Sequence, residues 1–136
     1  MKLYNTLTRQ KQEFVPINGV NLVVSREELV ELQKKTNSLS VHDSIFDYIV
    51  TLIEKTRNSE YFALGASPRG ANSLLRMSRA MALLSGRNYV VPDDIEAVFT
   101  AVLGHRVKLS SRARANGFTV DTALEEVRKS VKLPRT

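Results

Sequence analysis

The segment Gly65-Ala66-Ser67-Pro68-Arg69-Gly70 marks the start of a long helix, around which the other predicted elements are arranged. Ser67 is a favourable N-cap, and Pro68 suits the first helical position, where its missing N–H would be unpaired anyway. Gly86 is the expected C-terminal breaker. The sequence therefore predicts a helix from Pro68 to just before Gly86, whose apolar surface comes from Ala71, Leu74, Leu75, Ala80, Met81, Ala82 and Leu84.

Two helices are predicted before this one. Ser25-Arg26-Glu27-Glu28 has the pattern of a capping box, in which a hydroxyl and a carboxylate cap each other's backbone, and it opens a helix over about 26–35. His42-Asp43 caps a second helix over about 43–57. The apolar stripe of the first helix consists of Leu29 and Leu32, with Val30 at its margin. That of the second consists of Ile45, Ile49, Leu52 and Ile53, widened by Phe46 and Tyr48.

Two further helices are predicted after it. Pro92-Asp93-Asp94 opens one, with both carboxylates near the positive end of the helix dipole, although Val91 is a poor N-cap. This helix ends or frays at Gly104. Residues 107–109 are expected to be extended and 110–115 to hold one short turn. A last helix follows Thr119, with Leu124, Val127 and Val131 on one side.

The first 24 residues alternate as strands do. Strands are predicted over 3–8, 13–17 and 20–24, and Asn18-Gly19 favours the positive φ angles of a two-residue hairpin turn. The predicted fold class is therefore mainly α: a small bundle of about five helices with an N-terminal β-hairpin.

Composition excludes several classes of protein. Of the 136 residues, 25% are charged and 43% hydrophobic, and no apolar run is long enough to span a membrane. No secretory signal is recognisable at the start. The chain has no cysteine, which excludes disulfides and thiol catalysis, and with only His42 and His105 no metal site is expected. The absence of cysteine fits a reducing compartment, and we expect a cytoplasmic protein.

The net charge of +6 is uneven. Residues 104–136 hold eight basic and three acidic side chains, which raises the alternative of a small basic helical module that binds nucleic acid. Against it, the basic residues do not concentrate on one predicted recognition helix, and Arg112 and Arg114 fall in a loop-like stretch. A nucleic-acid partner is therefore not the favoured interpretation.

The sequence contains few groups that could carry out catalysis. It has no Gly-rich phosphate loop ending in Lys-Ser/Thr (Walker A) and no apolar strand ending in paired acids (Walker B). His42-Asp43 and Asp93-Asp94 are explained as helix caps. No enzymatic activity is expected from this chain in isolation.

Arg69 is the side chain best placed to bind an anion. As the second residue of its predicted helix, it lies near unpaired backbone N–H groups and the positive end of the dipole. Its planar guanidinium can donate two parallel hydrogen bonds to a phosphate, and Gly70 leaves room for close approach. Arg76 shares the same face. These residues favour an anionic ligand, although an arginine at a helix start is more often simply solvated.

A family resemblance adds to this interpretation. Gly65-Ala66-Ser67-Pro68-Arg69-Gly70, then 80–95 (Ala-Met-Ala-Leu-Leu-Ser-Gly-Arg-Asn-Tyr-Val-Val-Pro-Asp-Asp-Ile), then Val102-Leu103-Gly104-His105-Arg106 resemble the C-terminal lid of MoxR-family AAA+ ATPases. The resemblance covers about residues 22–134. Val91 departs from the pattern, because the family usually has a hydroxyl residue there.

The resemblance implies specific roles. Arg69 would be the sensor arginine, and Ser67, Pro68, Arg69 and Gly70 would contribute to nucleotide binding between the lid and an ATPase core that this chain lacks. ATP and Mg would belong to the full-length parent, with no tight binding by this chain alone. The partners implied are that core and neighbouring subunits of a ring, and the implied role is chaperone-like remodelling.

Residues 2–17 resemble the extreme N-terminus of cysteinyl-tRNA synthetases, although the zinc and nucleotide signatures of those enzymes do not follow. The expected organisation is thus a leader over 1–21, foreign to the lid, and a lid over 22–136. Without its core, the lid should expose apolar side chains and self-associate, with Tyr61, Phe62 and Leu64 as candidates.

Overall fold

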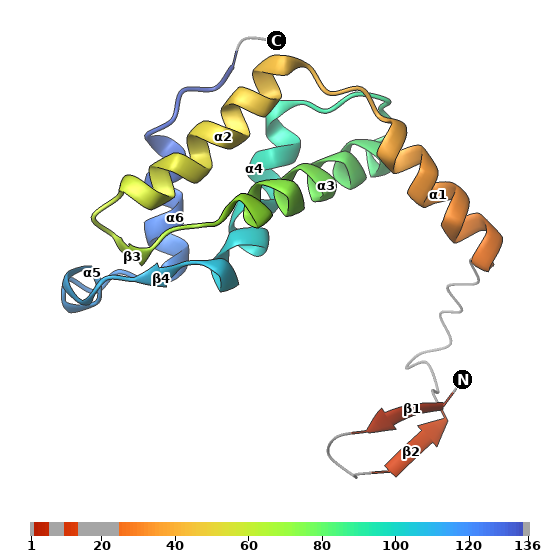
Figure 1. Cartoon of the computed structure of the whole chain (residues 1–136), viewed down its shortest axis with the longest axis horizontal. Coiled ribbons are helices and arrows are strands. Elements are labelled where there is room, and N and C mark those ends of the chain that lie inside the picture. The colour runs from red at the N-terminus through yellow and green to blue at the C-terminus, as the bar shows by residue number, and fades with distance from the viewer. Residues whose placement is uncertain (1, 6–9, 14–24, 135–136) are drawn as a thin grey trace. The chain divides into compact units, whose positions relative to one another are not determined.

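The computed structural model describes residues 2–5, 10–13 and 25–134 (Figure 1). The chain divides into two compact units, residues 1–30 and 31–136, which are described separately. None of the helices in the described part of the chain is long and apolar enough to cross a membrane.

The N-terminal unit contains a two-stranded antiparallel sheet. Strand β1 (Lys2–Asn5) pairs with β2 (Gln10–Glu13), so that Lys2 lies opposite Glu13 and Asn5 opposite Gln10. The strand predicted over 3–8 overlaps β1, whereas β2 lies mostly between the predicted strands. The hairpin predicted at Asn18-Gly19 lies outside the described residues.

Helix α1 (Arg26–Ser38) begins with the predicted capping box. The Ser25 N–H donates to Glu28 Oε2 at 2.7 Å, and the Glu28 N–H donates to Ser25 Oγ at 3.1 Å. These hydrogen bonds with Ser25 lower the pKa of the Glu28 carboxyl. The helix continues three residues past its predicted end at 35, and none of its residues is buried. The predicted apolar side, Leu29 and Leu32, is exposed.

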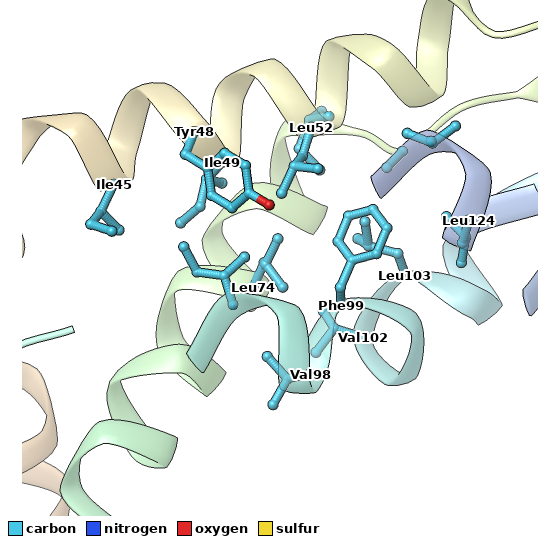
Figure 2. Close-up of a cluster of buried hydrophobic side chains, with 14 of the residues drawn as sticks. Ile45, Tyr48, Ile49, Leu52, Leu74, Val98, Phe99, Val102, Leu103 and Leu124 are labelled. Carbon is cyan, nitrogen blue, oxygen red and sulfur yellow. The ribbon is translucent and has the colours of Figure 1, made fainter. Parts of the chain in front are cut away.

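Four helices enclose the core: α2 (Asp43–Asn58), α3 (Pro68–Leu84), α4 (Pro92–Leu103) and α6 (Val120–Lys129). Figure 2 shows side chains from α2, α3, α4 and α6 meeting in this core. The largest fully buried apolar side chains are Phe99, Ile45, Leu52, Leu74, Ile95, Leu103 and Leu124. The predicted stripe of α2 is confirmed at Ile45, Tyr48, Ile49, Leu52 and Ile53, which are all buried. The expectation that Phe46 widens this stripe is wrong, because Phe46 is 39% exposed. In the last stripe Leu124 and Val127 are buried, and Val131 packs against the core while partly exposed.

The mainly helical fold class is confirmed, with one helix more than predicted. The turn expected over 110–115 is a short helix, α5 (Ser111–Ala115), and the fraying expected at Gly104 is a 3-10 turn, η2 (Gly104–Arg106). The described residues thus contain six α-helices.

A second small sheet lies beside the helices. Strand β3 (Phe62–Leu64) pairs antiparallel with β4 (Lys108–Leu109), which confirms the extended segment predicted there. The segment 58–66, interpreted as a loop, contains β3. The expectation that Phe62 is exposed is wrong, because it is only 7% exposed, whereas Leu64 is 63% exposed. Regular alternation would place these two side chains on one face of β3, but the pairing with β4 shifts register between Phe62 and Leu64, which breaks the alternation.

Two further expectations need correction. Leu84 was expected on the apolar side of α3, but it is 81% exposed, whereas Ala82 in the same last turn is fully buried. The start of α4 is better capped than Val91 suggests, since Asp94 Oδ2 accepts the Val91 N–H at 3.0 Å. The carboxylate supplies the half of a capping box that reaches back to the N-cap N–H, and the Asp94 N–H itself donates to the Val91 carbonyl at 3.1 Å.

Candidate functional site

Gly65 fixes where the segment before α3 can lie. A Cβ at this position would stand 2.5 Å from Arg57 Cα and 2.6 Å from Arg57 N, both in the last turn of α2. No side chain can be accommodated against backbone at that distance. Gly65 is therefore required for the close approach of this segment to α2.

Thr56 and Ala66 secure the same approach. Thr56 is fully buried, and its hydroxyl donates to the Ile53 carbonyl at 2.7 Å and accepts the Ala66 N–H at 2.9 Å. Ala66 is itself fully buried. The residue directly before the α3 N-cap is thus held by a satisfied buried hydrogen bond.

Gly70 packs the first turn of α3 against the end of α4. It is buried, and a Cβ there would lie 3.2 Å from Leu103 Cδ2 and 3.8 Å from Arg106 Cδ. The space that its missing side chain leaves is therefore bordered by this chain's own Leu103 and Arg106. The sequence analysis expected this space to allow the close approach of a ligand. The contribution of Gly70 to nucleotide binding stays a prediction.

Between these buried anchors, Ser67, Pro68 and Arg69 are exposed. Pro68 takes the first helical position, as predicted. Ser67 has the extended conformation of an N-cap, with φ −86° and ψ 166°, but its side chain makes no capping hydrogen bond. The predicted N-cap position is therefore confirmed, without a hydrogen bond from the exposed Ser67 side chain to the first turn.

Arg69 carries a positive charge where the helix dipole disfavours one. Within the described residues its guanidinium takes part in no ion pair, and the first turn of α3 has no acidic residue. By contrast, the Arg128 guanidinium lies 2.8 Å from the Glu96 carboxylate. An anion bound at the start of α3 would compensate both the guanidinium and the dipole.

Arg106 is a second cation at this place, which sequence reasoning did not single out. Its Nε donates to the Val102 carbonyl at 3.2 Å, and its Cδ lies beside Gly70. The contact joins residues 36 positions apart in sequence, so no local pattern could have revealed it. The signal available was Arg106 itself, at the end of the Gly104-His105-Arg106 motif.

The predicted caps are confirmed as caps. His42 Nδ1 accepts the Ser44 N–H at 3.2 Å at the start of α2. Asp94 is paired with Arg87 and caps α4. Across the part of the chain that the structure describes, no three His, Cys, Asp or Glu side chains come together in a way that could hold a metal ion.

Comparison with known proteins places this geometry in a family. The AAA lid domain family matches residues 54–127, more than half of the chain, and this match includes the α3 start. An ATPase candidate of Cytophaga hutchinsonii, solved by crystallography, superimposes with a TM-score of 0.77 and 30% identity, over 82% of this chain and 37% of its own.

Curated relatives agree with that match. The protein YeaC of Bacillus subtilis, described as uncharacterized, is 36% identical over 119 residues, which is 88% of this chain and 37% of YeaC. Chaperone MoxR1 of Mycobacterium tuberculosis is 32% identical over 122 residues, 83% of this chain and 32% of MoxR1. Protein MoxR of Methylorubrum extorquens is 56% identical over 45 residues, 33% of this chain and 13% of its own length.

This chain spans about a third of the length of YeaC and of MoxR1. The comparisons give no support to the resemblance of residues 2–17 to cysteinyl-tRNA synthetases. They do support the resemblance that rests on the segment before α3 and on the segments around α4. The chain belongs to the AAA lid domain family, and its relatives are of the MoxR type.

Proposed function

We propose that this chain is the lid of a MoxR-type AAA+ ATPase and that Arg69 reports the nucleotide state to the rest of the lid. The observation that carries the proposal is the exposed guanidinium of Arg69 at the start of α3, which forms no ion pair with any residue that the structure describes. It is presented by a segment held on both sides, by Gly65 and Ala66 against α2 and by Gly70 against α4.

The chemistry of this position fits the outer phosphates of ATP. A guanidinium donates in pairs to phosphate oxygens and stabilises the charge that develops during phosphoryl transfer. When hydrolysis removes the terminal phosphate, the attraction on Arg69 weakens. Because Arg69 is fixed on the bundle, the lid as a whole would move in response.

The neighbouring residues have supporting roles in this proposal. Ser67 offers an exposed hydroxyl that can donate to a phosphate oxygen, and Pro68 fixes the backbone at the first helical position. Gly70 sets the distance between α3 and α4. Mg would be held by the ATPase core and by the nucleotide. The phosphates of the nucleotide would supply the negative charge opposite Arg69.

The partners follow from the lid assignment. We infer an ATPase core and neighbouring subunits of a ring as the surfaces that this lid contacts, in the cytoplasm. Chaperone-like remodelling is proposed because the relative MoxR1 is named a chaperone. The division into a leader over 1–21 and a lid over 22–136 is retained as part of the proposal.

The role of Arg69 is tested in the full-length parent ATPase. Arg69→Ala should lower the steady-state turnover of ATP at least about tenfold, as the loss of one positioned charge typically does. Lys55→Ala is the control: it removes an exposed positive charge from α2, outside the segment 65–70 and its face of α3, and should leave turnover unchanged. Equal turnover of the Arg69→Ala and parent enzymes would remove Arg69 from this role.

The isolated chain gives an independent test. We expect no magnesium-dependent turnover of ATP by the purified 136 residues, because a lid supplies one charge and no phosphate loop. Sustained turnover that copurifies with the chain would contradict the assignment of the chemistry to a separate core.

A further inference from the structure

Cationic side chains distant in sequence gather at one end of the bundle. The pairing of β3 with β4 places Lys108 opposite Leu64, and Figure 1 shows β3, β4 and α5 at the same end. We call Arg57, Lys108, Arg112 and Arg114 the basic end; all four are exposed.

Contacts along residues 60–65 connect Arg57, Lys108 and Arg112. The backbone of Arg57 lies against Gly65, next to β3. The segment before β3 is tied to the start of α5, because Ser110 Oγ donates to the Glu60 carbonyl at 2.9 Å. Arg112 lies 3.5 Å from the Glu60 carboxylate, with both side chains more than two-thirds exposed. An exposed pair at that distance is weak and would yield to a stronger anion.

A small aromatic cavity opens beside these charges. It has a volume of about 180 Å³ and is lined by Glu60, Tyr61, Arg112, Ala113, Asn116 and Phe118. The rings of Tyr61 and Phe118 are 4.7 Å apart between centroids and tilted by 41°. A nucleobase can stack on partly exposed aromatic rings, and a neighbouring arginine or amide side chain can form hydrogen bonds with the edge of the base.

We propose that the basic end binds single-stranded nucleic acid, with phosphates along Arg57, Lys108, Arg112 and Arg114 and a base in the Tyr61–Phe118 cavity. The sequence argument against nucleic acid was that the basic residues do not share one helix. The structure answers that argument with three contacts: Gly65 lies against the backbone of Arg57, Leu64 pairs with Lys108, and Glu60 lies near Arg112. Residues 60–65 thus link cations from α2, β4 and α5.

The same observations select the type of partner. Helix α5 is only five residues long, too short to read a major groove, which disfavours duplex DNA. An acidic protein surface would use the charges but leave the aromatic cavity without a role. The site does not include Arg69, so it is independent of the function proposed above.

The direct test measures the anisotropy of a fluorescein-labelled oligothymidylate of about 12 nucleotides with the purified chain. With four phosphate contacts, a plot of the logarithm of the binding constant against the logarithm of the salt concentration should have a slope near about −2.8. This corresponds to about a fiftyfold loss of affinity between about 50 and 200 mM salt. The Arg112→Ala/Arg114→Ala variant should halve that slope. Lys34→Ala/Lys35→Ala on α1 changes net charge equally and should leave binding as in the parent.

Asn116→Ala and Phe118→Leu test the cavity separately. Phe118→Leu should weaken binding about tenfold while leaving the salt slope unchanged, because it removes stacking and no charge. Asn116 is exposed, so the Asn116→Ala variant is expected to fold even if circular dichroism shows that Phe118→Leu does not. Asn116→Ala should also weaken binding without changing the salt slope.

Three results would overturn the proposal. One is no anisotropy change at low salt. Another is equal weakening by the α1 and α5 double variants, which would mean attraction to net charge alone. The third is competition by polyglutamate as effective as by unlabelled oligonucleotide, which would assign the basic end to an acidic protein.

Discussion

Arg87 holds the buried carboxylate of Asp94 with both of its terminal nitrogens, at 2.7 Å to Oδ2 and 2.6 Å to Oδ1. The same carboxylate accepts the Val91 N–H, so one side chain closes the connection between α3 and α4 and begins α4. Burial opposes the charged form, but these hydrogen bonds outweigh it and lower the pKa of Asp94.

Removing the Arg87 charge should destabilise the bundle. Arg87→Met leaves Asp94, which is 4% exposed, without its charge partner, and we expect a loss of about 2 to 3 kcal/mol in the free energy of unfolding. Because the folded-state pKa of Asp94 is lowered, the contribution of the pair is present at neutral pH and is lost below about pH 4. Urea unfolding at neutral and acid pH measures both effects. A variant as stable as the parent at neutral pH would contradict this account.

Tyr48 should make the bundle sensitive to alkali. Burial and the nearby Glu96 carboxylate raise the pKa of Tyr48 to about 12. The folded pKa lies above the unfolded value of about 10, so the stability that neutral Tyr48 contributes is present below pH 10 and lost as pH rises toward 12. Tyr48→Phe should therefore lose less stability than the parent between about pH 9 and 11 in urea unfolding. Identical losses in the two proteins would refute the prediction.

Gly65 and Gly86 form a matched pair for testing the close approach to α2. Gly65→Ala should cost about 3 kcal/mol or more, because its Cβ would meet backbone atoms that cannot move aside. Gly86→Ala should cost about 1 kcal/mol, since a Cβ there meets nothing within 4 Å and only the φ of 72° is unfavourable. Thermal unfolding of the two variants should rank them in that order, and the reverse order would contradict the contact.

Leu64 is the candidate for self-association that remains exposed in the structure. If apolar surface that normally meets a core drives the isolated chain to associate, Leu64→Ser should shift it toward monomer in sedimentation equilibrium. Leu84→Ser, at an even more exposed leucine at the far end of α3, is the control and should have no effect. A parent chain that is monomeric at all concentrations would disprove the prediction.

The sequence was sufficient where the determinants are local. The capping box at Ser25, the apolar stripe of α2 and the start of α3 at Pro68 each follow from residues within a few positions of one another. The same reasoning missed the pairing of Phe62 with Leu109, because strand pairing over such a separation leaves no periodic signal in either segment.

In the candidate site, too, features set by neighbouring residues could be predicted and features set by distant contacts could not. The exposure of Arg69 could be expected from its place in the first turn of a helix. The roles of Gly65 and Gly70 could not, because the first depends on the last turn of α2 and the second on Leu103. Nor could the position of Arg106 be derived before the packing of α3 on α4 was known.

The arrangement of residues 65–70 has a consequence for how substitutions spread across the segment. Gly65, Ala66 and Gly70 contact the interior, whereas Ser67 and Arg69 face solvent and contribute little packing. Saturation of the five codons other than that of Pro68 should therefore yield two groups of variants. One group would lose soluble expression, and the other, at Ser67 and Arg69, would accumulate normally yet differ in what the assembled protein can do.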